Sequence, residues 1–241
     1  MRPLMTAIAA SSIVVDLAPV EVRLRGGLCV TVFEASDQDA ALEAAIDDGS
    51  DPFGSMCWPS SMAAANELLS APLEGRTVLE LGAGPGLASI AALHRGAAVI
   101  ATDCARVATR AARDGLEAAR ARGAPGTFRV ESLDISDHEA LAAKARDADI
   151  LVASDMLYEP ELAKKLGAAL RPYLATKAIL VTDPGRQKGR GVFLRELGPP
   201  ATSLFEDVRL AKAEAAALRI TPDAAGHINI GVFKHGFVDL Q

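Results

Sequence analysis

The nine residues from Val78 to Gly86, V-L-E-L-G-A-G-P-G, constrain the fold more than any other part of the chain. Their first half is a short apolar run bounded by turn signals, which is typical of a buried parallel strand. Three glycines at every second position follow, and such a turn lets a ligand approach the backbone closely. Residues 87–95 have the composition of a helix, which Gly96 ends. Strand, glycine turn and helix in this order predict the nucleotide-binding opening of a Rossmann-like, doubly wound α/β sheet.

The spacing of the glycines favours one class of nucleotide ligand. Gly82, Gly84 and Gly86 do not fit the G-x-G-x-x-G of a dinucleotide site, and no Lys-Ser/Thr pair follows for a P-loop. Glu80 lies at the end of the strand, where we expect its carboxylate to face the ligand crevice and neutralise a cation. A carboxylate there favours the sulfonium and ammonium of S-adenosylmethionine over the pyrophosphate of NAD.

A second apolar run, residues 97–102, ends at Asp103, which comes 19 residues after Gly84. An acid at about that distance, at the tip of the second strand, reaches the hydroxyl pair of a ribose. These features resemble motif I and the acid that follows it in class I S-adenosylmethionine-dependent methyltransferases, with an NAD site or a cofactor-binding protein without turnover as alternatives. The cofactor-binding residues predicted from them are Glu80, Gly82, Gly84, Gly86 and Asp103.

The composition narrows the class of protein. With 241 residues, half of them hydrophobic, the chain can form one α/β domain with a large core. Its net charge of −6 is opposite to that of a general nucleic-acid binder. Three cysteines without a C-x-x-C pair predict neither a disulfide framework nor a metal site, and they fit a reducing compartment. We expect a cytoplasmic protein, and separately we expect a monomer.

The hydropathy of the chain and its first residues bear on membrane insertion and on targeting. No apolar run reaches the length of a membrane span. The first fourteen residues suit neither a secretory signal nor a transit peptide, and we expect a disordered start, with import into mitochondria left open.

Two segments that alternate apolar and charged residues, 20–25 and 28–34, are joined by Gly26-Gly27 and predict a β-hairpin. We assign residues 1–50 to an N-terminal extension with this hairpin, and residues 51–241 to the methyltransferase domain. Five further predicted strands, the first of them alternating apolar and polar residues, complete a seven-stranded, mostly parallel sheet whose last strand is antiparallel. These segments are 127–133, 149–153, 178–182, 204–210 and 227–235.

Trp58 is the only tryptophan of the chain, and it precedes Pro59 and a helix that we expect Ser60 or Ser61 to cap. The common role of such a residue is that of a buried aromatic. A W-P-x-x segment ahead of the E-L-G-x-G-x-G strand, however, resembles methyltransferase family 16, the seven-β-strand lysine methyltransferases. The resemblance covers roughly residues 54–180. It implies that Trp58 lies against the cofactor.

The segment S-D-M-L-Y, Ser154 to Tyr158, follows the fourth strand at the carboxyl end, where open α/β sheets bind ligands. Asp155 and Tyr158 match the D/E-x-x-Y/F motif of the same family. The resemblance implies a protein N-lysine methyltransferase in which Asp155 accepts a hydrogen bond from the target amine, Tyr158 shapes the acceptor channel and Ser154 lies beside the cofactor. The N-P-P-Y/F motif of nucleic-acid amine methyltransferases is absent here. A small-molecule N-methyltransferase stays open.

Two further segments leave alternatives. Asp134 follows the third strand, and it either meets the adenine amino group, as the resemblance implies, or caps a helix from Ser136 onward. The tetrapeptide D-P-G-R at 183–186 resembles the branch of family 16 that methylates the β subunit of electron transfer flavoprotein. The loop that continues it carries Arg186, Lys188 and Arg190, and it predicts a mobile lid, a patch for an acidic partner surface or a solvated loop.

Overall fold

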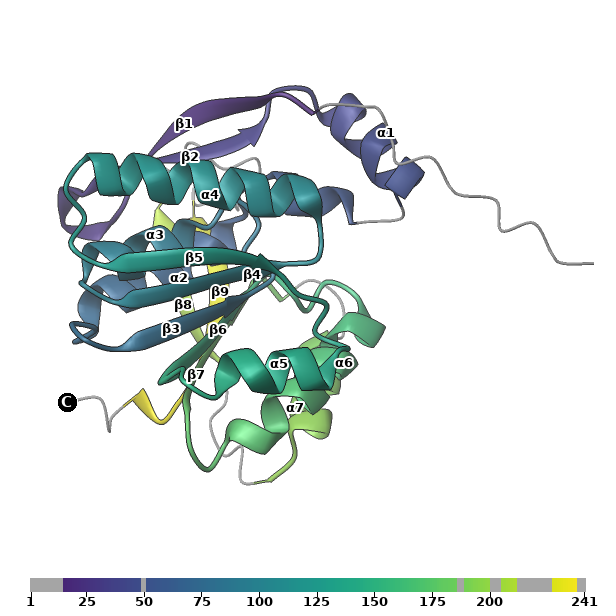
Figure 1. Ribbon diagram of the computed structural model, residues 1–241. Helices are drawn as coiled ribbons and strands as arrows, with labels where there is room; N and C mark the ends of the chain where they lie inside the picture. Colours follow the sequence, from purple (N-terminus) through teal and green to yellow (C-terminus); the bar gives the residue numbers. More distant parts are fainter. Residues whose placement is uncertain (1–14, 49–50, 186–188, 200–204, 212–226, 238–241) are drawn as a thin grey trace, which may run out of the picture.

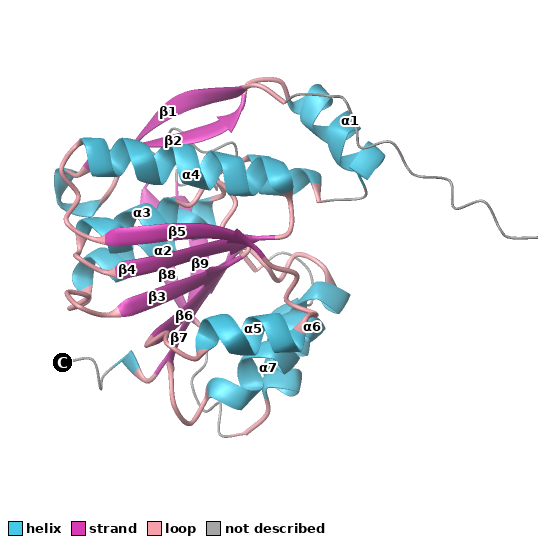
Figure 2. Cartoon of the chain, viewed as in Figure 1, coloured by secondary structure: helices cyan, strands magenta, loops and turns pink. Residues whose placement is uncertain are grey.

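The computed structural model describes residues 15–48, 51–185, 189–199, 205–211 and 227–237 (Figure 1). A seven-stranded sheet lies between two layers of helices (Figure 2). Its strand order is β5-β4-β3-β6-β7-β9-β8. The strands are β3 (Thr77–Leu81), β4 (Ala98–Asp103), β5 (Thr127–Ser132), β6 (Ile150–Ser154), β7 (Ala178–Asp183), β8 (Glu206–Ala211) and β9 (His227–His235).

The direction of the strands confirms the predicted fold class. The pairs β3–β4, β3–β6, β4–β5 and β6–β7 are parallel, whereas β9 runs antiparallel to both β7 and β8. The chain moves outward in one direction from β3 to β5 and then in the other from β6, so the order reverses between β3 and β6. Ligands of doubly wound sheets bind outside the carboxyl ends of the strands at such a point. The glycine turn after β3 and Asp155 after β6 both lie there.

Helices cover both faces of the sheet. One layer holds α2 (Pro59–Ser70), α3 (Leu87–His94) and α4 (Arg106–Ala121). The other holds α5 (His138–Ala145), α6 (Pro160–Leu170), continued by the short η3 (Arg171–Tyr173), and α7 (Gly189–Leu197). Because successive side chains of a strand point to opposite faces, Val78 of β3 packs in the first layer and Leu79 and Leu81 pack in the second.

The N-terminal hairpin forms a separate two-stranded sheet outside the helix layer. It consists of β1 (Leu17–Arg23) and β2 (Cys29–Ala35), joined by η1 (Arg25–Gly27), where Gly26 has a φ of 76°. The hairpin lies over α4 (Figure 1), and its valines share a buried cluster with α3 and α4. Helix α1 (Gln38–Asp48) follows it. The domain boundary predicted after residue 50 adjoins residues 49–50, which lie outside the described residues, and it stays a prediction.

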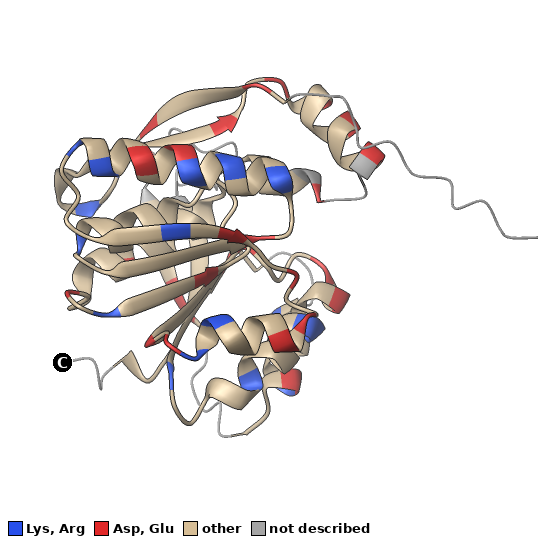
Figure 3. Cartoon of the chain, in the orientation of Figure 1, with Lys and Arg blue, Asp and Glu red and all other residues tan. Residues whose placement is uncertain are grey.

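Two helices of the first layer, α4 and α2, differ in where their polar residues lie. Charged residues recur along the length of α4 (Figure 3), whereas the helix buries Leu116 and four of its six alanines. The predicted cap of α2 is wrong. Pro59 occupies the first helical position, which suits a residue that lacks a backbone N–H, and Trp58 is the N-cap residue. Ser60 and Ser61 therefore lie inside the first turn, where both are buried.

Candidate active site

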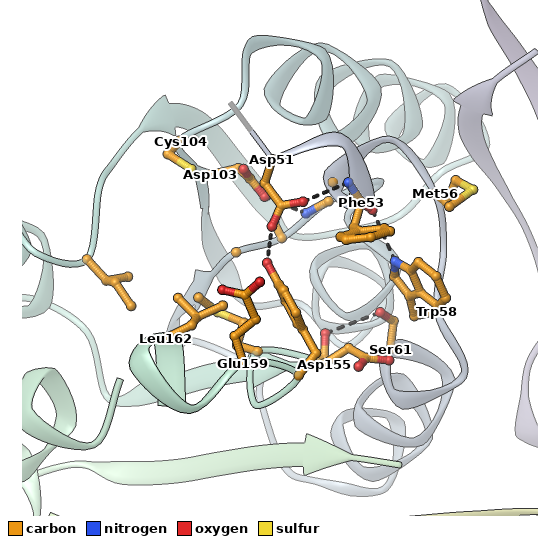
Figure 4. A pocket seen from close by; sticks show the side chains of 18 of the residues that line it. Asp51, Phe53, Met56, Trp58, Ser61, Asp103, Cys104, Asp155, Glu159 and Leu162 are labelled. Carbon is orange, nitrogen blue, oxygen red and sulfur yellow. Dashed lines mark hydrogen bonds between the residues drawn. The ribbon is translucent and has the colours of Figure 1, made fainter. Parts of the chain in front are cut away.

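A pocket of about 590 Å³ opens at the carboxyl ends of β3 to β6 (Figure 4), a volume typical of small-molecule sites. Its walls come from the segment before α2, the glycine turn, the tips of β4 and β5, and the segment from the end of β6 into α6. Eight of the ten predicted site residues line it: Trp58, Gly82, Gly84, Asp103, Asp134, Ser154, Asp155 and Tyr158. Glu80 and Gly86 do not.

The conformation and close packing of the glycine turn disfavour side chains at its glycine positions. Gly82 and Gly84 have φ values of 61° and 53°, in the left-handed region. A Cβ atom on Gly82 would lie 2.5 Å from the Sδ atom of Met156, which also lines the pocket. Gly86 has a different function, because a Cβ atom there would lie 3.1 Å from the Cβ atom of Ala112. The third glycine thus permits close packing of α3 against α4.

Asp103 ties the tip of β4 to the glycine turn. Its Oδ2 atom accepts a hydrogen bond from the Gly84 N–H at 2.9 Å, and its Oδ1 atom accepts one from the Ala105 N–H at 2.9 Å. Burial nevertheless raises the pKa of Asp103 above its ordinary value. A carboxylate has about four lone-pair sites, so Asp103 keeps acceptor capacity for hydroxyl groups of a ligand in the pocket.

The expectation that the Glu80 carboxylate faces the crevice is wrong. The alternation of β3 turns Glu80 to the same side as Val78, toward α3, and the side chain is fully buried. Its Oε2 atom accepts hydrogen bonds from the N–H and the hydroxyl of Ser89 at 2.9 and 2.5 Å. Its Oε1 atom has no partner among the described residues. Because burial outweighs the two bonds from Ser89, the pKa of Glu80 rises to about 7.

The backbone conformation of Asp155 sets it apart. Among the described non-glycine residues it alone has a left-handed φ, of 57°, a region that aspartate enters more readily than most residues. Its Oδ2 atom accepts a hydrogen bond from the hydroxyl of Ser60 at 3.2 Å. The hydroxyls of Ser154 and Ser61 also lie within hydrogen-bonding distance, at 3.2 Å. The first turn of α2 thereby holds the end of β6. This contact was not predicted, because Ser60 or Ser61 was expected to cap the helix.

A cluster of three aromatic side chains also lines the pocket, and one of them, Phe53, was not predicted. The ring of Phe53 lies 6.0 Å from that of Trp58 and 5.9 Å from that of Tyr158, both edge to face. The Trp58 Nε1 donates a hydrogen bond to the carbonyl of Phe53 at 3.0 Å (Figure 4). The Tyr158 hydroxyl donates one to the carboxylate of Asp51. Asp51 and Phe53 belong to the same short segment as Trp58, which was the signal available for finding them.

One of the two alternatives for Asp134 is wrong. Helix α5 begins at His138, and its N-cap is Asp137, whose Oδ1 atom accepts a hydrogen bond from Ala140 N–H at 2.9 Å. Asp134 instead accepts a hydrogen bond from the Ser136 N–H at 2.8 Å, and this bond lowers its pKa. Its side chain lines the pocket, where contact with a cofactor stays a prediction.

The charge of the pocket favours a cationic ligand. Lys165 is the one basic residue on its described walls. Clustered charges of one sign around a cleft attract ions of the opposite sign. The acidic residues of the pocket are Asp51, Asp103, Asp134, Asp155, Glu159 and Glu161.

No helix in the described part of the chain is long and apolar enough to cross a membrane, and no cluster of metal-ligating side chains was found there.

Comparison with known proteins identifies the family. A sequence model described as lysine methyltransferase matches residues 37–198, two thirds of the chain. The chain belongs to the lysine methyltransferase family. Electron transfer flavoprotein beta subunit lysine methyltransferases are among its relatives, one of Xenopus laevis at 34% identity over 65% of this chain and 63% of the relative, and the human one at 31% over 59% and 53%. The chain thus spans less than two thirds of the length of these relatives. The resemblance predicted from W-P and D-x-x-Y is confirmed.

Solved structures share the fold of this lysine methyltransferase family member. A SAM-dependent methyltransferase from Agrobacterium tumefaciens aligns with a TM-score of 0.54 at 15% identity, covering 90% of this chain and 69% of the other. The 16S rRNA N2 G1207 methyltransferase of T. thermophilus, in complex with AdoMet and guanosine, aligns with a TM-score of 0.54 at 18% identity, covering 91% and 50%. Identities this low show a common fold and carry no information on the methyl acceptor.

The basic loop after β7 is only partly described. Arg186 and Lys188 lie outside the described residues. Arg190 donates hydrogen bonds to the carboxylate and carbonyl of Asp183, at 2.9 and 2.5 Å, and its guanidinium lies 5.0 Å from the ring centre of Phe205. Asp183 is fully buried. Arg190 therefore stabilises the end of β7, and the interpretation of the loop as a patch for a partner does not extend to it.

Proposed function

We propose that this family member transfers a methyl group from S-adenosylmethionine to the side-chain amine of a lysine in a protein substrate. One observation carries the proposal: Asp155 and Tyr158 lie on the same pocket as the glycine turn and Asp103. Such a pocket holds an acceptor group next to a nucleotide. Family membership supports lysine as the acceptor, and the names of the matched relatives suggest the beta subunit of an electron transfer flavoprotein as the first substrate to test.

The residues of the pocket fit the cofactor. Gly82 and Gly84 line the pocket, and its acidic walls match a ligand that carries a sulfonium and an ammonium. In this proposal Asp103 accepts hydrogen bonds from the ribose hydroxyls, Asp134 accepts one from the adenine amino group, and Trp58 packs against the cofactor. The bound cofactor supplies an electrophilic methyl group on sulfur.

The acceptor side of the pocket has to bind a cation and then favour its neutral form. A free lysine has a pKa of about 10.4, so it arrives as an ammonium, and the acidic walls attract it. Removal of water from around the lysine ammonium disfavours its charged form, and so does the positive charge of the cofactor nearby. Both effects favour release of a proton from the ammonium to the solvent. Asp155 is held in place by the Ser60 hydroxyl and by its own N–H, which donates to the carbonyl of Thr182 in β7. In this proposal its carboxylate accepts an N–H of the amine and directs the lone pair toward the methyl group.

The test uses radiolabelled S-adenosylmethionine, the purified protein and a cell extract, with products separated by size. Asp155→Asn is the appropriate variant, because asparagine accepts the left-handed φ at this position and removes only the charge. We expect a labelled protein band with the wild type, its loss with Asp155→Asn and an unchanged cofactor Kd by calorimetry. Asp147→Asn, at an exposed residue before β6, is the matched control.

The outcomes separate the candidate functions. Label on a protein, mapped to lysine by mass spectrometry, supports the proposal. Label confined to small molecules would replace it by a small-molecule N-methyltransferase, which the acidic pocket also fits. Cofactor binding without any transfer to the electron transfer flavoprotein beta subunit or to the extract would favour a cofactor-binding regulatory protein.

We also propose that the protein works as a monomer in the cytoplasm. Its three free cysteines, Cys29, Cys57 and Cys104, support a reducing compartment, and its negative charge speaks against nucleic acid as the substrate. Light scattering on the purified protein tests the monomer. Fractionation of cells that express a tagged chain tests the compartment, and recovery in mitochondria would correct it.

A further inference from the structure

The carboxylate of Asp51 joins two segments that border the acceptor side of the pocket. Its Oδ1 atom accepts a hydrogen bond from the Phe53 N–H at 2.8 Å and caps the short η2 (Pro52–Ser55). Its Oδ2 atom accepts the hydrogen bond from the Tyr158 hydroxyl. The Phe53 ring packs edge to face against Tyr158, so the phenol is held by a polar and an aromatic contact from the same segment. Neither D-x-x-Y nor the glycine turn accounts for Asp51.

The direction of this hydrogen bond determines whether the Tyr158 hydroxyl can donate or only accept a hydrogen bond in the pocket. An ionised carboxylate only accepts hydrogen bonds, whereas a phenol hydroxyl can both donate and accept. With its proton committed to Asp51, the Tyr158 hydroxyl has only lone pairs left for the pocket. The Tyr158 oxygen is then an acceptor, like the carboxylate of Asp155, and both residues line the pocket.

Two acceptors match the geometry of the proposed methyl acceptor. A neutral lysine amine has two N–H bonds and one lone pair, arranged around nitrogen together with Cε. If one N–H is bound by Asp155 and the other by Tyr158, the lone pair is left with a single direction. A single acceptor would leave the amine free to rotate about its first hydrogen bond, and the population aligned for transfer would fall.

We propose that Asp51 is a positioning residue that makes the Tyr158 hydroxyl a hydrogen-bond acceptor for the substrate amine. The inference rests on the proposed lysine methyltransferase function and adds a third side chain to the acceptor site. Asp51 acts through Tyr158 and does not touch the amine itself.

Asp51→Asn tests the direction of the bond with little change of shape. The Phe53 N–H is a donor, so the amide must present its oxygen there to keep the cap, and its NH₂ group then faces Tyr158. The phenol oxygen has to accept from this NH₂, and its proton turns toward the pocket. The cap and the ring packing stay, while the acceptor becomes a donor.

We expect Asp51→Asn to lower kcat on the protein substrate by about tenfold, the effect of one oriented hydrogen bond. The cofactor Kd, from calorimetry, should change much less than kcat, because five of the six acidic side chains of the pocket remain, and the melting temperature should stay at its wild-type value. Tyr158→Phe should lower kcat to a similar extent. The double variant should be no slower than Tyr158→Phe alone, because Asp51 has no effect without the hydroxyl. Asp147→Asn again serves as the exposed control.

Three results would overturn the inference. Wild-type kcat in Asp51→Asn, with Tyr158→Phe slow, would show that the direction of the bond does not matter. An additional tenfold loss in the double variant would show that Asp51 acts by another route. A lower melting temperature in Asp51→Asn that accounts for the loss of activity would assign it a structural role. Failure of the wild type to label any lysine would overturn the proposed function itself and this inference with it.

Discussion

Glu80→Gln should change how the stability of the protein depends on pH. Glu80 is fully buried, and burial raises its pKa from 4.5 to about 7. The unfolded chain releases this proton at the ordinary pKa and the folded chain only at the raised one. The contribution of Glu80 to stability is therefore largest below about pH 4.5, falls as the pH rises and is lost above about pH 7.

The size of the effect follows from the two pKa values. A difference from 4.5 to about 7 corresponds to about 3 kcal/mol of unfolding free energy. Glutamine does not titrate and keeps an amide oxygen that can accept the bonds from Ser89. Relative to the wild type, Glu80→Gln should therefore gain about 3 kcal/mol between pH 4.5 and about pH 8. Carboxylates with lowered pKa values, such as Glu131 and Asp134, act equally in both proteins and cancel in the difference.

Urea unfolding, followed by far-ultraviolet circular dichroism at several pH values between these limits, measures the difference. Both proteins are compared at each pH, so that only the change attributable to position 80 remains. A stability difference that is constant across the range would refute the reasoning. It would mean that Glu80 titrates alike in the folded and unfolded chains.

Three further predictions concern the walls of the pocket and the end of β7. Gly82→Ala should lower stability by about 2 kcal/mol and abolish cofactor binding in calorimetry, because its φ of 61° and the Met156 sulfur leave no place for a Cβ atom. Asp103→Asn should weaken cofactor binding by about tenfold or more, and an unchanged Kd would remove Asp103 from the site. Arg190→Met should lower the free energy of unfolding by about 3 kcal/mol, since it leaves the buried Asp183 carboxylate without its cation. Its cofactor Kd should remain that of the wild type.

The parts of the fold that depend on local patterns could be predicted from the sequence. The apolar strands and the glycine turn carry their signals within a few residues, and the hairpin follows from alternation and Gly26-Gly27. The side to which Glu80 points could not be predicted in the same way, because a shift of one position reverses the face of every side chain in a strand. The glutamate lies one residue from Leu81, which faces the other helix layer.

The polar contacts of the pocket depend on residues that are far apart in the chain. The bond between Ser60 and Asp155 joins positions 95 residues apart, and that between Asp51 and Tyr158 joins positions 107 apart. Neither serine nor aspartate has a sequence signal that names a partner at such a distance, and each also has an ordinary local use as a cap or turn residue. The chemistry of the site was therefore predicted through family motifs, and the side chains that position it emerged only from the structure.

The order of the sheet has a consequence for synthesis on the ribosome. Strand β9 lies between β7 and β8, although it is translated after both. In the nascent chain one edge of β7 stays unpaired until residues 227–235 have emerged, and among the described strands β8 pairs with β9 alone. An unpaired hydrophobic strand edge recruits other chains, so chaperones or a low expression temperature should raise the soluble yield more than any change to the pocket. Strands β3 to β6, which carry the pocket, pair with one another and, through β6, with β7, so this part of the sheet can form before β9 emerges.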